Sequence, residues 1–199
     1  MGETDLKQQL AERFREVNGT HPMTDADDAY ASDQFVPLEK LCAVRGYDSD
    51  AVRRLMLGRR LPLPGYLRSD GAEMVPTDLF ALADEAGGTE LLEAWFTAHW
   101  DDPAAGRKEW EAYLSGQYVC LHSVTPATIR RKNYLTTAIS ATVNEPDAGS
   151  AQWLEHLHAL VDELDVLETA FTDYDRLRFR GPTSREICID AIRARYTRT

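Results

Sequence analysis

The spacing of apolar residues along the chain predicts a mainly α-helical protein. An amphipathic helix covers residues 4–17 and ends at Asn18-Gly19, because glycine readily leaves the helical backbone conformation. Residues 21–34 are acidic and poor in apolar side chains, which predicts an exposed linker. Two short helical patterns follow within residues 35–60, separated by a tight turn that contains glycine, and together they predict a helix-turn-helix.

The segment 58–76 interrupts the helical pattern. Pro62 and Pro64 favour extended backbone, and Asp70-Gly71 stands between two short β-prone runs, which is typical of a β-hairpin. The sequence therefore predicts a small wing after the helix-turn-helix. We expect this wing to be held rigidly against the two preceding helices and to offer a recognition surface.

Helical patterns dominate the second half of the chain, apart from residues 117–124, which are apolar and either β-prone or a buried connector. Thr125-Pro126 is a strong helix start, and Thr183 and Glu186 stand at capping-box spacing before a closing helix. In that closing helix we expect the inward side chains to be Ile187, Ala191, Ile192 and Tyr196.

The expected fold class is therefore mainly α, with a winged helix-turn-helix-like N-terminal half packed on a helical C-terminal half. We expect three parts along the chain: an N-terminal helix and acidic linker over 1–34, the winged module over 35–88 and a helical domain over 89–199.

Composition limits the classes of function. The 199 residues hold 22 basic and 33 acidic side chains, and the net charge of −11 disfavours general binding to DNA or anionic membranes and favours a basic partner face. We see neither a membrane-spanning run nor an apolar signal core. Cys42, Cys120 and Cys188 lack CxxC spacing, which indicates reduced thiols and a cytoplasmic protein. The common nucleotide, zinc-protease and serine-hydrolase motifs are absent from the sequence, so we expect no cofactor and no metal.

Basic residues nevertheless concentrate in 45–68, where six arginines face two aspartates, a local balance of 6 − 2 = +4. The order of helices, wing and following helix over residues 35–86 resembles the N-terminal module of MerR-type and excisionase-type regulators. These arginines can contact DNA phosphates, dock a partner protein or pair with carboxylates of the same chain. The predicted partner-binding residues are Arg53, Arg54, Arg59, Arg60, Tyr66 and Arg68.

A second candidate site comes from polar residues of the helical half. Asp162 and Asp165 are helical neighbours that can face one cleft for acid–base work, although acidic runs of this kind are more often a solvated face. His122 would share a strand face with Cys120 if that segment is extended. Arg178 precedes the last helix and can hold an anion or pair with the acidic run. The candidate pocket residues are Tyr113, His122, Asp162, Asp165, Arg178 and Arg185.

Five short motifs, over residues 61–66, 70–76, 113–121, 124–129 and 181–185, resemble those of the DUF6058 family of small actinobacterial natural-product biosynthesis proteins. The resemblance covers about residues 30–196, with Thr183 at a position where other residues are common. It implies a role in a biosynthetic gene cluster but supplies no catalytic residues. It also suggests that some members act beside a separate catalytic protein, such as a sulfotransferase-like enzyme in pathways to aziridine-containing amino acids.

Three functions follow as hypotheses. The first is an accessory or co-catalytic subunit of a heteromeric tailoring enzyme, which docks a catalytic protein from the same gene cluster. The second is a stand-alone small enzyme that binds a small-molecule intermediate in a pocket of the helical half. The third is a winged-helix regulator, which the acidity of the chain disfavours.

Overall fold

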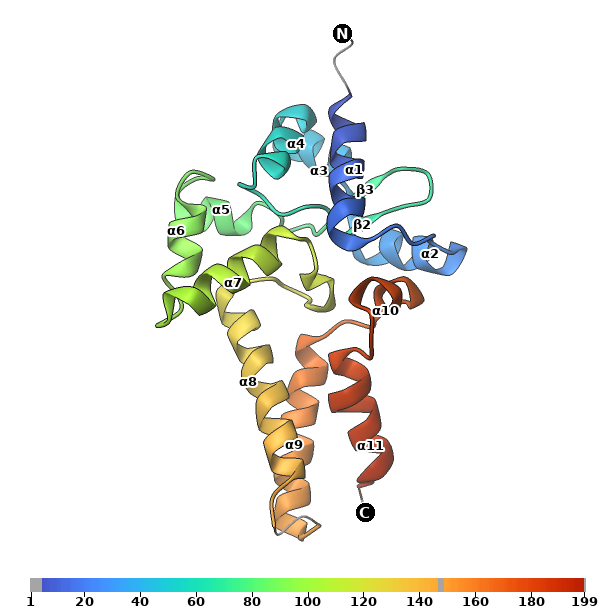
Figure 1. The fold of residues 1–199 in the computed structure, drawn as a ribbon, viewed down its shortest axis with the longest axis vertical. Coiled ribbons are helices and arrows are strands. Elements are labelled where there is room, and N and C mark those ends of the chain that lie inside the picture. The colour runs from blue at the N-terminus through green and yellow to red at the C-terminus, as the bar shows by residue number, and fades with distance from the viewer. Residues whose placement is uncertain (1–4, 147–148, 199) are drawn as a thin grey trace. The chain divides into compact units, whose positions relative to one another are not determined.

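The computed structural model describes residues 5–146 and 149–198, and these form two compact units (Figure 1). Unit 1 runs as far as Val119 and includes residues 172–174, and unit 2 holds the remaining residues. The fold is mainly helical, with a small antiparallel sheet in unit 1, as the hydrophobic pattern predicts. The boundary between the units follows residue 119, whereas the sequence analysis started the helical domain at residue 89.

Unit 1 contains seven helices and three strands within the described residues. They are α1 (Leu6–Asn18), α2 (Asp25–Gln34), β1 (Val36–Pro37), α3 (Leu38–Arg45), α4 (Ser49–Leu57), β2 (Tyr66–Leu67), β3 (Glu73–Val75), α5 (Ala81–Ala86), α6 (Leu92–Thr97) and α7 (Pro103–Leu114).

Unit 2 is built from long helices and short turns. They are a 3₁₀ turn η1 (Tyr118–Cys120), whose last residue opens the unit, α8 (Pro126–Val143), α9 (Ala151–Leu167), most of α10 (Asp173–Phe179), a π-helical turn η2 (Glu186–Asp190) and α11 (Ala191–Arg195).

The segment expected to be an exposed linker instead forms helix α2. Thr24 accepts a hydrogen bond from the Asp27 backbone N–H, and the Asp27 carboxylate accepts from the Thr24 N–H in return, so the two residues make a complete capping box. The helix has almost no apolar stripe, since only Asp27 and Ala31 are buried. The linker prediction was wrong because capping, rather than hydrophobic periodicity, marks this helix.

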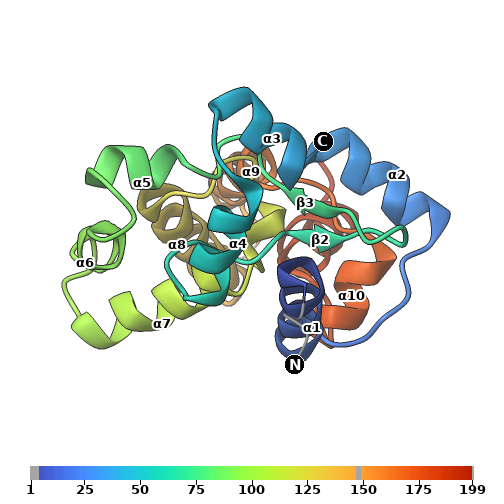
Figure 2. The same ribbon diagram turned by 90° about the horizontal axis from the view of Figure 1, so that it is seen from above.

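The predicted hairpin is present and consists of β2 and β3 (Figure 2). It is part of a three-stranded antiparallel sheet in the order β1-β3-β2. Met74 of β3 pairs with Tyr66 on one side and with Pro37 on the other. The sequence does not predict strand β1, because the pattern from residue 35 onward indicates a helix. At the turn, Gly71 has a φ of 79°, a conformation that glycine adopts at little cost.

Unit 2 has a core between α8, α9 and the C-terminal helical segment. Leu135, Ile139, Leu157, Val161 and Leu164 are buried in it, and α8 and α9 lie side by side along their length (Figure 1). The helix starts at Thr125-Pro126 and at the Thr183–Glu186 capping box are confirmed.

The inward face of the closing helix differs from the prediction. Ile187 is 53% exposed and Ala191 is exposed, whereas Cys188, Ile189 and Ile192 are buried. The backbone N–H of Ala191 donates to the Glu186 carbonyl, five residues back. This π turn carries one extra residue and rotates the faces relative to an ideal α-helix.

Candidate functional site

Two of the six residues predicted to bind a partner are buried in unit 1. Tyr66 is fully buried, with its ring against Phe35, and Arg53 is 4% exposed. The wing as a whole is not the exposed surface that the sequence analysis expected, because residues 61–66 and 73–75 are buried and the exposed part is its tip. That tip is tied to α2, where the Ser69 N–H donates to Asp28 Oδ1 (3.1 Å).

Arg53 forms a buried ion-pair network that joins the helix-turn-helix to the sheet. Its Nε donates to Glu73 Oε1 (3.0 Å) and its Nη2 to Glu73 Oε2 (2.6 Å). The same guanidinium also donates to Asp50 of α4 (2.8 Å) and to Glu39 of α3 (2.9 Å). Arg53 therefore holds α3, α4 and β3 together and has a structural role.

Most of the remaining arginines of residues 45–68 are also paired within unit 1, and Arg54 is exposed. The surface ion pairs are Arg45–Asp84, Arg59–Glu111, Arg60–Glu90 and Arg68–Asp70. The local positive charge that the sequence shows is thus largely balanced by carboxylates that come from other parts of the unit.

The six candidate pocket residues do not come from one unit. Tyr113 lies in unit 1, buried against Phe96 and Trp110, and this burial raises the pKa of its hydroxyl. The other five belong to unit 2, where His122 is exposed and Arg178 is buried beside Asp175.

Asp162 and Asp165 are ion-paired rather than free to act as an acid and a base. Arg193 donates to both carboxylates, at 3.0 Å and 2.8 Å. Arg185 binds Asp165 at 2.5 Å, and Arg198 also binds Asp162. The hydrogen bonds to Arg198 and Arg193 lower the pKa of Asp162, and burial only partly offsets them. The acidic run therefore pairs with Arg185, Arg193 and Arg198, whereas the sequence analysis expected either a solvated face or pairing with Arg178.

A cluster that the sequence analysis did not assemble lies at the start of unit 2. Lys132 of α8 places its Nζ 2.9 Å from Cys120 Sγ and 2.8 Å from Glu168 Oε1, and Ser184 Oγ donates to the same Glu168 oxygen. Cys120 and Glu168 are buried, and the Lys132 side chain is 14% exposed. We call Cys120, Lys132, Glu168 and Ser184 the Cys–Lys cluster.

Burial and charge act in opposite directions within this cluster. Burial raises the pKa of the Cys120 thiol, and the Lys132 ammonium offsets only part of that rise. Burial by itself would lower the pKa of Lys132, but Cys120 and Glu168 outweigh it and raise that pKa. At neutral pH the cluster therefore holds an ammonium group between a carboxylate and a sulfur atom.

The sequence contained one signal for the cluster. Lys132 lies three residues from each of the buried Ile129 and Leu135, so it stands on the apolar face of α8. Glu168 follows Leu164 by four residues and stands just past the apolar stripe of α9. Charged residues on buried helical faces need a partner, and the two charges provide it for each other. His122 and Cys120 do not share a strand face, because Tyr118–Cys120 form a 3₁₀ turn rather than a strand.

An apolar groove of about 560 Å³ lies in unit 1, lined by residues of α4, α5 and the loops beside them. Its lining includes Tyr47, Val52, Leu55, Phe80 and Ala83. The charged residues among the described groove-lining positions, Asp48 and Asp84, are both acidic. We call this surface the α4–α5 groove.

Exposed apolar side chains adjoin the α4–α5 groove. Tyr47, part of its lining, is 44% exposed and stacks edge-on against Phe80. Leu91 is 55% exposed and lies beside Gly87, another lining residue. Exposed apolar groups gathered at a groove are typical of an interaction site.

Residues 5–146 and 149–198 hold no group of three or more His, Cys, Asp or Glu side chains placed to bind a metal ion. Within the same ranges, each helix is too short or too polar to cross a lipid bilayer.

Fold and sites together define a mainly helical protein with a winged helix-turn-helix-like region in unit 1 and a buried Cys–Lys cluster in unit 2. The family model described as "Family of unknown function (DUF6058)" matches residues 92–197, and the chain belongs to this family. The Cys–Lys cluster lies inside the matched region, and the α4–α5 groove lies before it. No curated protein matches the chain. No solved structure matches it either.

Proposed function

We propose that this protein is an accessory, non-catalytic or co-catalytic subunit of a heteromeric enzyme in natural-product biosynthesis. The α4–α5 groove, with Tyr47 and Leu91 exposed beside it, is the observation that supports docking of a partner. The biosynthetic setting and the partner class, a catalytic protein encoded in the same gene cluster, rest on the resemblance of the sequence motifs to natural-product proteins.

The occupant that fits the groove is an apolar segment flanked by basic residues. The groove walls are apolar, and the charged lining residues in the described part of unit 1 are Asp48, which caps helix α4, and Asp84, which pairs with Arg45, so the preference for a basic partner rests on the charge of the whole chain. The whole chain carries a net charge of −11, which favours the approach of a positively charged surface. Cationic flanks would also avoid the repulsion that a second acidic chain would meet.

The other two hypotheses have less support. DNA binding needs free cations, whereas Arg53, Arg59, Arg60 and Arg68 are all paired with carboxylates of unit 1. A stand-alone enzyme built on Asp162 needs a carboxylate free to exchange protons, and that group is held by two arginines.

Reconstitution tests the proposal. The full chain is produced with each enzyme encoded beside it in the native genome, and turnover of each enzyme is measured with and without the chain. We expect one enzyme to co-purify with the chain and to lose most of its activity when the chain is left out. If all of the neighbouring enzymes reach full turnover without the chain, the proposal fails.

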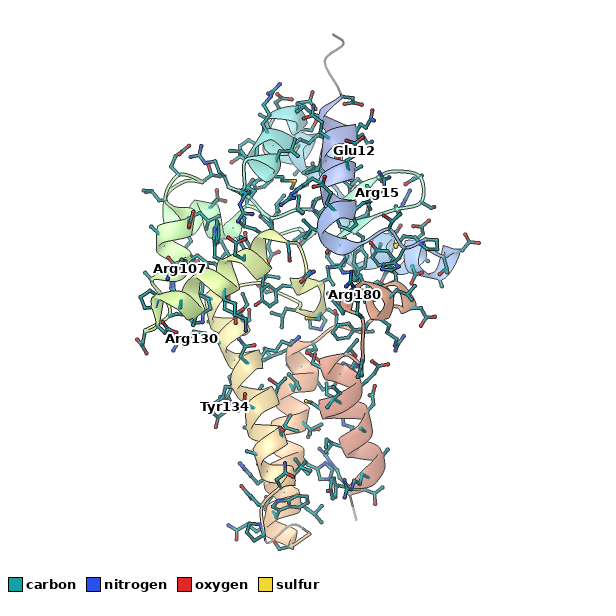
Figure 3. The ribbon with its side chains drawn as sticks, viewed as in Figure 1. Glu12, Arg15, Arg107, Arg130, Tyr134 and Arg180 are labelled. Atoms are coloured by element: carbon teal, nitrogen blue, oxygen red, sulfur yellow. The ribbon has the colours of Figure 1, made fainter. Side chains whose placement is uncertain are left out.

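Matched variants locate the docking surface. Leu91→Glu is expected to abolish co-purification, and Leu177→Glu, at a position of similar exposure (50%) in unit 2, is expected to leave it intact. Tyr47→Ala and Tyr134→Ala form a second pair, since both rings lie near an arginine and Tyr134 projects from α8 (Figure 3). Loss of binding in the Leu177 and Tyr134 variants, but not in the others, would place the surface elsewhere.

A further inference from the structure

The Cys–Lys cluster brings a thiol and a primary amine into direct contact in the protein interior. Lys132 Nζ lies 2.9 Å from Cys120 Sγ. Glu168 Oε1 accepts from the same Nζ at 2.8 Å, and its other carboxylate oxygen is buried without a hydrogen-bond partner among the described residues. A sulfur atom is a weak acceptor for an ammonium group, so this contact carries little stabilisation for the desolvation it requires.

We propose that Cys120 and Lys132 are a modification site, at which hydrogen peroxide joins the cysteine sulfur covalently to the lysine nitrogen. This inference is independent of the docking function. The link would tie the turn η1, where unit 2 begins, to helix α8.

The chemistry balances with one peroxide molecule. The Cys120 sulfur attacks one peroxide oxygen, an S–O bond forms, the O–O bond breaks, and a water molecule leaves with the thiol proton. Lys132, having passed its extra proton to Glu168, attacks the sulfenic sulfur. An S–N bond forms, the S–O bond breaks, and a second water molecule leaves with a proton from the amine. Sulfur loses two electrons and the peroxide gains them.

A second peroxide molecule can give the same link with one oxygen atom between sulfur and nitrogen, and it releases one further water. An interposed oxygen leaves the two atoms close to their present 2.9 Å separation, whereas a direct bond requires Nζ to move toward the sulfur. The lysine side chain is long and has several rotatable bonds, so it can make that movement.

The other two thiols serve as internal comparisons. Cys42 is also buried, in unit 1, and the charged groups that act on it are Arg53, Asp48, Glu73 and Glu39 rather than a lysine. Cys188 is buried in unit 2, where the charges of Glu168 and Lys132 act on its thiol. It is therefore the competing partner for an oxidised Cys120.

The experiment is peroxide treatment of the folded full chain, followed by tryptic digestion without reductant and mass spectrometry. The cleavage sites around Cys120 and Lys132 predict a linked pair formed by residues 109–130 and 132–176, because a modified Lys132 is no longer cleaved. The mass of this pair should equal the sum of the two peptide masses minus two hydrogens, or that value plus one oxygen. Dithiothreitol should separate the two peptides. Either mass supports the proposal.

Two variants make the test specific. Lys132→Arg keeps a cation opposite Glu168 but removes the primary amine, so the linked pair should disappear while Cys120 stops at its own oxidised forms. Cys188→Ala should retain the pair. The proposal is overturned by a disulfide joining 109–130 to 186–193, by sulfinic acid at Cys120 of the wild-type chain without a link, or by a Cys120 that stays unreacted while added glutathione is fully oxidised. The wild-type digest gives this answer even if a variant does not fold.

Discussion

Replacement of Arg53 by alanine tests whether the buried ion pair holds unit 1 together. The substitution removes both hydrogen bonds to Glu73, whose side chain is only 2% exposed, and leaves that carboxylate buried without its partner. Breaking a buried pair in this way typically costs about 3–5 kcal/mol. Glu39 and Asp50 are 59% and 48% exposed, so water replaces their contacts at little cost. For a protein of this size, the loss corresponds to a melting temperature lower by roughly 6–20 °C.

Urea and thermal unfolding measured by tryptophan fluorescence suit this test, because Trp95, Trp100 and Trp110 belong to unit 1. Arg59→Ala is the matched control, since its pair with Glu111 is about half exposed on both sides and should contribute less than about 1 kcal/mol. The reasoning is refuted if Arg53→Ala destabilises the protein no more than Arg59→Ala does. A double variant that also replaces Glu73 by glutamine should recover part of the loss, because it removes the stranded charge.

Three further predictions concern single positions. Gly116→Ala should destabilise unit 1 by at least about 2 kcal/mol in urea unfolding, because φ is 73° and a Cβ would lie 2.5 Å from the Pro64 carbonyl oxygen. Gly71→Ala has a similar φ but open space around the Cβ position, so it should cost only the strain of the left-handed backbone conformation. Backbone and side-chain hydrogen bonds from Thr183 and Arg176 lower the pKa of Glu186 from 4.5 to about 2. The contribution of the ionised Glu186 side chain to folding stability is therefore present above pH 4.5 and is lost as the pH falls toward 2. The difference in melting temperature between wild type and Glu186→Gln should accordingly shrink over that range, and a constant difference would contradict it. Lys132→Met should lower the thermal stability of unit 2 more than Lys132→Arg, because methionine leaves the Glu168 carboxylate buried and unpaired.

The sequence was most informative where local signals decide the structure. Thr125-Pro126 starts a helix because the threonine caps it and the proline fits its first turn, and both effects depend on neighbouring residues alone. The hairpin turn at Gly71 is local in the same sense. Helix α2 was missed although its Thr24–Asp27 capping box is also local, because the prediction weighted apolar periodicity above capping.

The sites were harder to predict because they join distant parts of the chain. Arg53 and Glu73 are 20 residues apart, and the sequence places an arginine on a helix without showing whether it points to solvent or to the sheet. Cys120 and Glu168 meet only because residues 120 and 168 flank the paired helices α8 and α9, with Leu121 and Glu168 forming an isolated bridge. Such pairings depend on topology, which periodicity does not specify.

The two buried cations nevertheless share a signal that patterns do contain: each stands on the buried face of its helix. Arg53 adjoins the buried Val52 and Met56 positions of α4, and Lys132 lies between Ile129 and Leu135 of α8. The structure separates their roles by their partners. Arg53 meets carboxylates of three elements, which satisfy its guanidinium and explain its burial as structural. Among the described residues Lys132 contacts one carboxylate, a thiol and the ring of Phe171, so part of its hydrogen-bonding capacity is spent on poor acceptors. The structural partners thus explain the burial of Arg53 fully and the burial of Lys132 only in part. Buried charges of the second kind are typical of reactive sites, so Lys132, rather than the arginine-rich wing, is the position to test first for reactivity.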